Sequence, residues 1–206
     1  MSPSRLETFA DGVFAIAATL LILNVDAQVG EGSGAIGQRL LDIWPSYIAY
    51  AVSFVTIGII WSNHHTVMNQ LGRVDRTFLL LNVFLLMCVA FLPFPTRLVA
   101  EHLRGGRHDL QPAALAYGAT MTVMALAYIT LWLYATRKQR LLRPDSDPRT
   151  ISGITRSYLP GAPLYLTATL IAFASPLTSV AVFAAIALFY VIESSFFGRA
   201  TSLEGT

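Results

Sequence analysis

Residues 5–25 read Arg-Leu-Glu-Thr-Phe-Ala-Asp-Gly-Val-Phe-Ala-Ile-Ala-Ala-Thr-Leu-Leu-Ile-Leu-Asn-Val, and this stretch decides the fold. Its opening carries Arg5, Glu7 and Asp11, whereas Val13 to Val25 contains no charged residue. At a rise of about 1.5 Å per residue, Asp11 would lie roughly 9 Å inside an apolar helix, where an isolated carboxylate is costly. The stretch therefore predicts a membrane-spanning helix whose acidic residue has a partner or a function.

The composition of the whole chain points to the same environment. Of its 206 residues, 54% are hydrophobic and 13% are charged, and the mean hydropathy is +0.57. This charge density is about half that of an ordinary soluble domain, so we expect the lipid bilayer as the solvent. A net charge of only +2 gives no reason to expect nucleic acid as a partner.

Six apolar stretches are close to the roughly 20 residues that cross about 30 Å of hydrocarbon. We expect transmembrane helices at approximately 6–26, 43–69, 76–99, 112–136, 155–174 and 177–197. The connections are short, with a Gly-rich one at Gln28–Gly37 and a basic one at Arg137–Thr150. The sequence therefore predicts an all-α, multi-pass membrane protein in which residues 1–206 form a single domain.

The positions of the basic residues predict the orientation. If the N-terminus is cytoplasmic, ten of the 14 Lys and Arg residues fall on cytoplasmic segments and four on the opposite side. Cytoplasmic loops carry an excess of Lys and Arg, so we expect both termini in the cytoplasm. The basic segment Arg137–Thr150 is then expected to face lipid head groups.

The first helix carries two stripes on a 3.6-residue period. One stripe comprises Asp11, Ala15, Ala18 and Ile22. Its small residues allow close helix approach, so we expect this face to pack against protein. The other comprises Arg5, Phe9, Gly12, Ile16, Thr19 and Leu23, with Leu20 beside it. This second stripe either contacts lipid or core, or surrounds an axis in several copies and forms a narrow dewetting constriction. Periodicity leaves both interpretations open.

Three polar side chains share the depth of Asp11. His64 and His65 lie about seven residues, roughly 10 Å, inside the second helix, and Asn82 lies at a similar depth in the third. Trp61 and His65 are four residues apart and lie on one face of the helix, with His64 beside them. We interpret these residues as a structural polar network, with a proton relay as the alternative. No metal site or enzyme is expected, because adjacent histidines point about 100° apart and no nucleophile or further ligand joins them.

The same residues carry a resemblance to a known family. Residues 5–11, Arg-Leu-Glu-Thr-Phe-Ala-Asp, resemble the Arg-x-x-x-Phe-Ser-Asp signature of transmembrane protein 175, the potassium channel family of endosomes, lysosomes and prokaryotes. Further matches are Ile57-Gly58 followed by Trp61-Ser-Asn-His64-His65, and Asn82 through Leu86 to Pro93-Phe94-Pro95-Thr96. The chain departs from the signature at Ala10, where the family has Ser. The second half matches only in hydropathy and length.

The resemblance implies a prokaryotic plasma-membrane protein that forms a homotetramer, with the first of six helices in each subunit lining a central pore. It implies a potassium-permeable cation channel that needs no cofactor and is constricted by side chains of that helix. The narrowest ring would be Ile16, with Thr19, Leu20 and Leu23 above it. A network that holds the first three helices together would comprise Arg5, Phe9, Asp11, Trp61, His64, His65 and Asn82.

Such a channel has no carbonyl filter. Thr56-Ile57-Gly58-Ile59 is the nearest approach to one, but it lies in a continuous apolar helix, and we interpret Gly58 as a close-packing position. Selectivity would then depend on the cost of dehydration at Ile16 and on the Thr19 hydroxyls, which predicts a modest preference for K⁺ over Na⁺.

A proton-coupled secondary transporter that uses Asp11, His64 and His65 is the alternative, because these groups could titrate. Against it, the chain shows no internal repeat, and no helix interruption is expected near the midplane, since Pro163 and Pro176 fall near helix ends.

Overall fold

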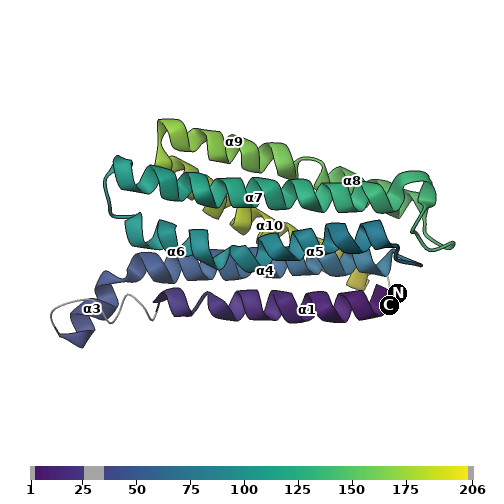
Figure 1. The fold of residues 1–206 in the computed structure, drawn as a ribbon, viewed down its shortest axis with the longest axis horizontal. Coiled ribbons are helices and arrows are strands. Elements are labelled where there is room, and N and C mark those ends of the chain that lie inside the picture. The colour runs from purple at the N-terminus through teal and green to yellow at the C-terminus, as the bar shows by residue number, and fades with distance from the viewer. Residues whose placement is uncertain (1–2, 26–34, 204–206) are drawn as a thin grey trace.

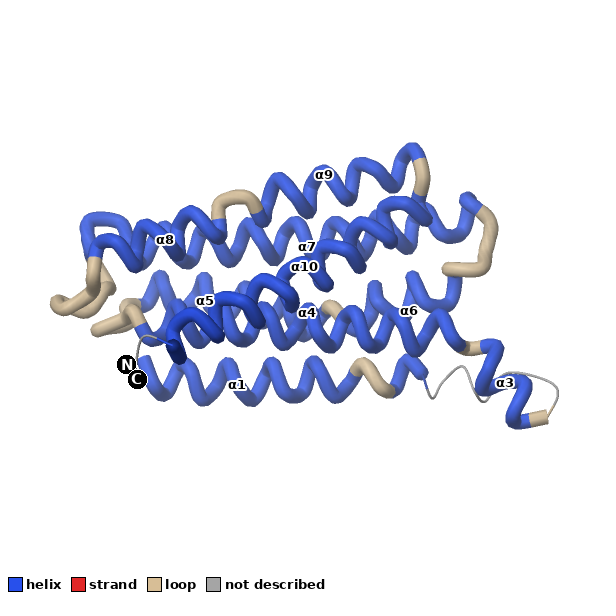
Figure 2. The backbone as a smooth tube through the Cα atoms, turned by 180° about the vertical axis from the view of Figure 1, so that it is seen from behind, coloured by secondary structure: helices blue, strands red, loops and turns tan. Residues whose placement is uncertain are grey.

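The long helices lie side by side along one axis (Figures 1 and 2). The computed structural model describes residues 3–25 and 35–203, and it describes side chains as far as Tyr190. The helices are α1 (Pro3–Leu20), α3 (Ile36–Asp42), α4 (Trp44–Asn69), α5 (Arg76–Phe91), α6 (Pro93–His102), α7 (Arg107–Thr136), α8 (Pro148–Tyr158), α9 (Gly161–Ala174) and α10 (Pro176–Leu203). Most of the predicted Gly-rich connection lies outside the described residues, and its end falls in α3, a short helix that was not predicted.

Four described helical segments are long and apolar enough to cross a membrane: Pro3–Val25, Trp44–Asn69, Arg76–His102 and Arg107–Gln139. They correspond to the first four predicted helices, although the fourth begins five residues earlier than predicted. The last predicted helix is also observed, as α10, and the helix continues beyond the predicted end at 197. The all-helical prediction is therefore confirmed for the described residues.

The third predicted helix is interrupted at Leu92, between α5 and α6. Pro93 and Pro95 have no N–H group, so the helical hydrogen bonds that these positions would make are absent. The Val89 carbonyl, which Pro93 leaves without its usual donor, accepts from the Leu92 N–H instead (3.1 Å). The side-chain amide of Asn24 donates to the Pro93 carbonyl (3.0 Å) and so ties this point to the first membrane segment. The prediction of an unbroken helix over 76–99 is wrong at this point.

The fifth predicted helix, 155–174, is divided into α8 and α9 at Leu159 and Pro160. Helix α8 begins earlier than predicted because the Asp147 carboxylate caps it, accepting from the backbone N–H groups of Arg149 (3.2 Å) and Thr150 (3.1 Å). One side of α8 packs against the core through residues Ile151, Ile154 and Tyr158. Its arginines are exposed, so this segment is amphipathic rather than uniformly apolar.

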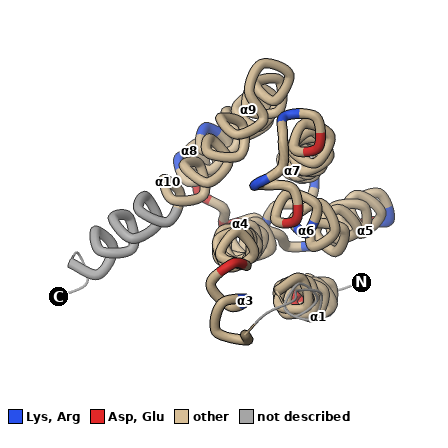
Figure 3. The backbone as a smooth tube through the Cα atoms, turned by 90° about the vertical axis from the view of Figure 1, so that its left-hand side faces the viewer, with Lys and Arg blue, Asp and Glu red and all other residues tan. Residues whose placement is uncertain are grey.

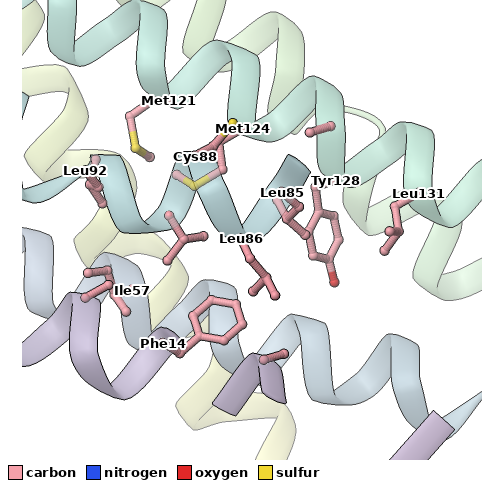
Figure 4. Close-up of a cluster of buried hydrophobic side chains, with 14 of the residues drawn as sticks. Phe14, Ile57, Leu85, Leu86, Cys88, Leu92, Met121, Met124, Tyr128 and Leu131 are labelled. Carbon is pink, nitrogen blue, oxygen red and sulfur yellow. The ribbon is translucent and has the colours of Figure 1, made fainter. Parts of the chain in front are cut away.

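The core lies between α7 and the helices around it. Figure 4 shows Leu85 and Cys88 of α5 on the side of Met124 and Tyr128 of α7, whereas Leu86 projects towards Phe14 of α1. Viewed along the bundle, α1 lies at its edge, beside α4 (Figure 3), and it also packs against α5. Because lipid tails are as apolar as these side chains, close packing rather than transfer from water holds such helices together.

At the end of the bundle where α1 begins, two connections dock on each other (Figure 1). The Gly72 N–H donates to the Leu141 carbonyl (2.9 Å), and the Arg143 N–H donates to the Gln70 carbonyl (3.0 Å). Asp75 caps α5 by accepting from the Phe78 N–H (2.9 Å). Its second oxygen accepts from the Tyr134 hydroxyl (2.7 Å), which ties this cap to α7.

This cap predicts a pH dependence. The Phe78 N–H, followed by the Tyr134 hydroxyl and Arg140, holds the pKa of Asp75 below its ordinary value of 3.8. Because the folded-state pKa is the lower one, the stabilisation is fully present above pH 3.8 and is lost as the pH falls through the folded-state value. We expect the melting temperature of the purified protein to fall more steeply below about pH 4 than that of Asp75→Asn.

In this comparison Asn keeps an acceptor for the cap but does not titrate. Asp75→Ala removes the cap at all pH values and is expected to cost about 1 kcal/mol. Parallel melting curves of the wild-type protein and Asp75→Asn across this pH range would contradict the role assigned to Asp75.

Candidate functional site

Helix α1 has one buried and one open side. The buried side consists of Leu6, Ala10, Phe14, Ala17 and Leu21, each no more than 2% exposed. These residues recur at spacings of three and four, and they place the larger apolar groups against α4 and α5. The opposite side of α1 remains uncovered in the single chain.

The four predicted constriction residues lie on the open side. Ile16 is 62% exposed and Leu23 is 56% exposed, and Thr19 and Leu20 are exposed as well. The Thr19 hydroxyl donates to the carbonyl of Ile16 (2.9 Å), so its hydrogen is used within the helix and its oxygen faces outwards. Phe9 is exposed on the same side. A contiguous apolar surface of this kind requires lipid or another protein surface against it.

The stripe that was predicted to pack against protein does not do so within the chain. Asp11, Ala15 and Ile22 are exposed, and Ala18 is half-buried. The prediction is wrong for the single chain because the larger side chains of Leu6, Phe14 and Leu21 set the buried side instead. Asp11 nevertheless has a partner, since the indole Nε1–H of Trp61 donates to its carboxylate (2.8 Å).

The polar residues form separate pairs rather than one network. The Glu7 carboxylate contacts Nδ1 of His65 (2.7 Å), one helical turn from the Asp11–Trp61 pair. The Trp61 and His65 rings are stacked, with centroids 6.4 Å apart. Together the two pairs join α1 to α4 along an exposed edge. Asp11 bonds to Trp61 rather than to a histidine, and the stacked Trp61 and His65 rings connect its pair with the Glu7 pair.

Glu7 was missed as a site residue. Glu7 and Asp11 are separated by four positions, as are Trp61 and His65. On two antiparallel helices, such matching spacings bring both pairs into register. This signal was therefore present in the sequence.

His64 and Asn82 form a third pair, which is fully buried and in which His64 Nε2 lies 2.7 Å from the amide oxygen of Asn82. Among the described residues, His64 Nδ1 and Asn82 Nδ2 have no hydrogen-bond partner. Phe14 packs against the His64 ring, with centroids 5.4 Å apart. Ala10 lies one turn before Phe14 on the same buried side, and it supplies no hydroxyl where the resembling signature has Ser.

Two further expectations concern Arg5 and metals. Arg5 is exposed and has neither an ion pair nor a hydrogen bond to any residue within 3–25 and 35–190, so a tethering role is not visible within one chain. In the described part of the chain, no three His, Cys, Asp or Glu side chains are grouped so that they could hold a metal ion.

Comparisons with known proteins identify a family and individual proteins that this chain resembles. The family model described as endosomal/lysosomal potassium channel TMEM175 matches residues 5–93, which contain all three polar pairs and the open side of α1. A potassium channel of Streptomyces collinus is 41% identical over 186 residues, covering 90% of each chain. The endosomal/lysosomal proton channel TMEM175 of Danio rerio is 33% identical over 148 residues, which are 68% of this chain and 28% of that protein.

A solved structure shares the fold as well. The crystal structure of a lysosomal potassium-selective channel TMEM175 homologue from Chamaesiphon minutus has a TM-score of 0.79 and 35% identity, covering 93% of this chain and 97% of that one. These family and structural neighbours are ion channels, not enzymes. The resemblance seen in the first three helices thus extends over nearly the whole chain, which belongs to the transmembrane protein 175 (TMEM175) family of potassium channels.

Proposed function

We propose that this chain is a potassium-permeable cation channel that assembles as a homotetramer in the plasma membrane of a prokaryote. The observation that carries the proposal is the open side of α1, where Ile16, Thr19, Leu20 and Leu23 present an uncharged stripe long enough to line a pore. Similarity to a potassium channel across 90% of both chains supports the same function. The proposal includes six membrane spans in one domain and cytoplasmic termini, in agreement with the distribution of basic residues.

In the proposed tetramer, four copies of α1 surround the axis and Ile16 forms the narrowest ring. An apolar ring offers an ion no replacement for its hydration water, so passage depends on the cost of partial dehydration. K⁺ holds its water less tightly than Na⁺ and passes more readily. Each Thr19 hydroxyl donates its hydrogen to a backbone carbonyl, so the lone pairs of its oxygen can coordinate a cation. The mechanism predicts modest selectivity.

Recording from the purified protein in planar bilayers tests the function. With K⁺ on one side and Na⁺ on the other, we expect currents that rise linearly at small voltages and a reversal potential that favours K⁺. Protein-free bilayers provide the baseline. If bilayers that contain folded protein carry no current above this baseline, the channel proposal is wrong.

The break at Leu92 does not favour the transporter alternative, because Leu92 keeps helical backbone angles (φ −55°, ψ −37°) and exposes no unwound segment. Asp11 bonds to Trp61 whereas His64 is buried with Asn82, so the groups that the alternative requires do not share one relay. Saturating flux that depends on a pH gradient, without a linear current, would favour the transporter.

Asp11 is proposed to act on assembly, because its bond to Trp61 fixes the side of α1 that other subunits meet. We expect Asp11→Ala to lower the yield of tetramer, measured by size-exclusion chromatography with light scattering, before it alters permeation. A hydrogen bond to a charged group contributes about 1.5–3 kcal/mol, and each tetramer would lose four. Asp11→Asn keeps an acceptor and serves as the control. An intact tetramer with altered selectivity would contradict this order of effects.

A further inference from the structure

A cavity of about 520 Å³ lies between α4, α7, the junction of α8 and α9, and α10. It opens on a side of α4 different from the one that meets α1, because Gly58 and Ser62 line it whereas Trp61 and His65 contact α1. The cavity is therefore separate from the stripe proposed to line the pore. Its volume falls within the range of about 300–1,000 Å³ that is typical of small-molecule sites.

Two glycines keep this cavity open. A Cβ atom added at Gly58 or at Gly161 would meet no atom within 4 Å. The interpretation of Gly58 as a close-packing position is therefore wrong, since the missing side chain leaves space rather than contact. Gly161 lies at the start of α9, directly after the interruption at Pro160, so the division of the predicted fifth helix helps to form the cavity.

The chemistry of the lining excludes charged ligands. None of the lining side chains is a Lys, Arg, Asp or Glu, so a charged molecule would lose its hydration without gaining an ionic partner. Met121 and Met124 supply adaptable apolar surface, and Figure 4 shows both projecting from α7 towards the interior of the bundle. The apolar or aromatic part of a ligand would pack well against these thioether side chains.

One polar group in the lining is poorly paired. Tyr128 is only 9% exposed, and among the described residues no group makes a well-formed hydrogen bond with its hydroxyl. The hydroxyl of Tyr158 interacts with it, but that group itself donates to the Asn63 carbonyl (3.4 Å). A buried hydroxyl without a well-formed hydrogen bond is destabilising by about 1–3 kcal/mol, so this group favours a ligand that accepts a hydrogen bond. An acceptor such as a carbonyl oxygen would satisfy it.

We propose that this cavity binds an uncharged amphiphile that enters from the bilayer. Its apolar or aromatic part would lie against Met121 and Met124, and its carbonyl oxygen would accept from the Tyr128 hydroxyl. A neutral lipid with an ester group and a small aromatic ketone share this chemistry. The proposal does not depend on ion conduction.

Benzophenone tests the proposal because it is uncharged, has two aromatic rings and one carbonyl acceptor, and inserts on illumination into nearby C–H bonds, including those of methionine. The purified full-length protein in lipid nanodiscs is illuminated with it and analysed by peptide mass spectrometry. We expect adducts concentrated on Met121 and Met124. Tyr128→Phe should weaken saturable labelling by about two- to tenfold, the loss of one hydrogen bond.

A cavity-filling variant provides the decisive comparison. Gly58→Leu should reduce labelling of the methionines by at least about fivefold, because its side chain would occupy roughly the volume of several methylene groups in the cavity. Gly153→Leu is the control, since Gly153 in α8 also has open space beside it but does not line the cavity. Gly161→Val serves in its place if Gly58→Leu does not fold.

Competition experiments distinguish the two possible sources of the ligand. Competition by dioleoylglycerol would identify a lipid source and competition by unlabelled acetophenone a small ketone, and either result supports the proposal. Equal labelling of the wild-type protein and the filled variants would overturn it. Adducts spread evenly over lipid-facing residues, or no saturable labelling of the folded protein, would overturn it as well.

Discussion

Replacing Ile16 with Asn is expected to raise single-channel conductance and to bring the K⁺/Na⁺ permeability ratio towards one. In the proposed pore, four isoleucines form the ring at which ions lose water, and an amide can replace part of that water. A reduction of the barrier by about 1.4 kcal/mol would raise the conductance about tenfold. Currents in planar bilayers under asymmetric K⁺ and Na⁺ give both quantities.

Ile22→Asn is the matched control for this experiment. Ile22 is an exposed isoleucine in the same membrane segment, in the turn directly after α1, but it belongs to the stripe that begins at Asp11. Its substitution introduces the same amide outside the proposed constriction stripe and should leave permeation nearly unchanged. If Ile16→Asn leaves conductance and ion preference at their wild-type values, Ile16 does not form the constriction.

The membrane helices could be predicted because hydrocarbon imposes a length and an apolar composition that the sequence displays directly. The interruptions could not be located in the same way. Pro93 and Pro160 were visible in the sequence, yet membrane helices often tolerate proline when neighbouring groups satisfy the freed carbonyls. Whether a given proline interrupts its helix depends on contacts such as that of the Asn24 amide with the Pro93 carbonyl, which no local pattern contains.

The sequence placed several polar residues of the candidate site at one depth, but it did not predict how they pair. Depth along each helix placed Asp11, His64 and Asn82 at one level, and depth does not specify which way each side chain points. Register between α1 and α4 decides that Asp11 meets Trp61 and that His64 is buried against Asn82. The four-residue spacing from Glu7 to Asp11, which matches that from Trp61 to His65, indicated this register.

Glycines show a second limit of sequence reasoning. Gly58 was interpreted as a close-packing position and faces open space, whereas a Cβ added at Gly118 would collide with Thr169. Both are glycines within long apolar helices, and nothing in their neighbours along the chain distinguishes them. The distinction depends on which helix crosses at that point, since small residues matter only where two backbones approach.

Gly118→Ala is expected to destabilise the protein strongly, because Gly118 is the position where α7 meets α9. An added Cβ would lie 2.5 Å from the hydroxyl oxygen of Thr169 and 2.9 Å from its Cβ. Thr169 cannot turn aside without losing its bonds to the Tyr165 carbonyl (2.7 Å) and the Thr122 hydroxyl (3.1 Å). Overpacking of this kind typically costs about 1–3 kcal/mol, and Gly118→Leu should prevent folding.

Gly58→Ala provides the comparison for Gly118→Ala, since it makes the same substitution in a neighbouring membrane helix at a site with open space. There the removal of a helix-weakening glycine should leave stability unchanged or raise it by up to about 1 kcal/mol. The melting temperature in detergent should therefore fall for Gly118→Ala and should stay unchanged or rise for Gly58→Ala. Thr169→Ala removes the atom closest to the added Cβ, so it should restore part of the loss in the double variant with Gly118→Ala. Equal melting temperatures for Gly118→Ala and Gly58→Ala would show that α7 and α9 do not pack as closely as 2.5 Å implies.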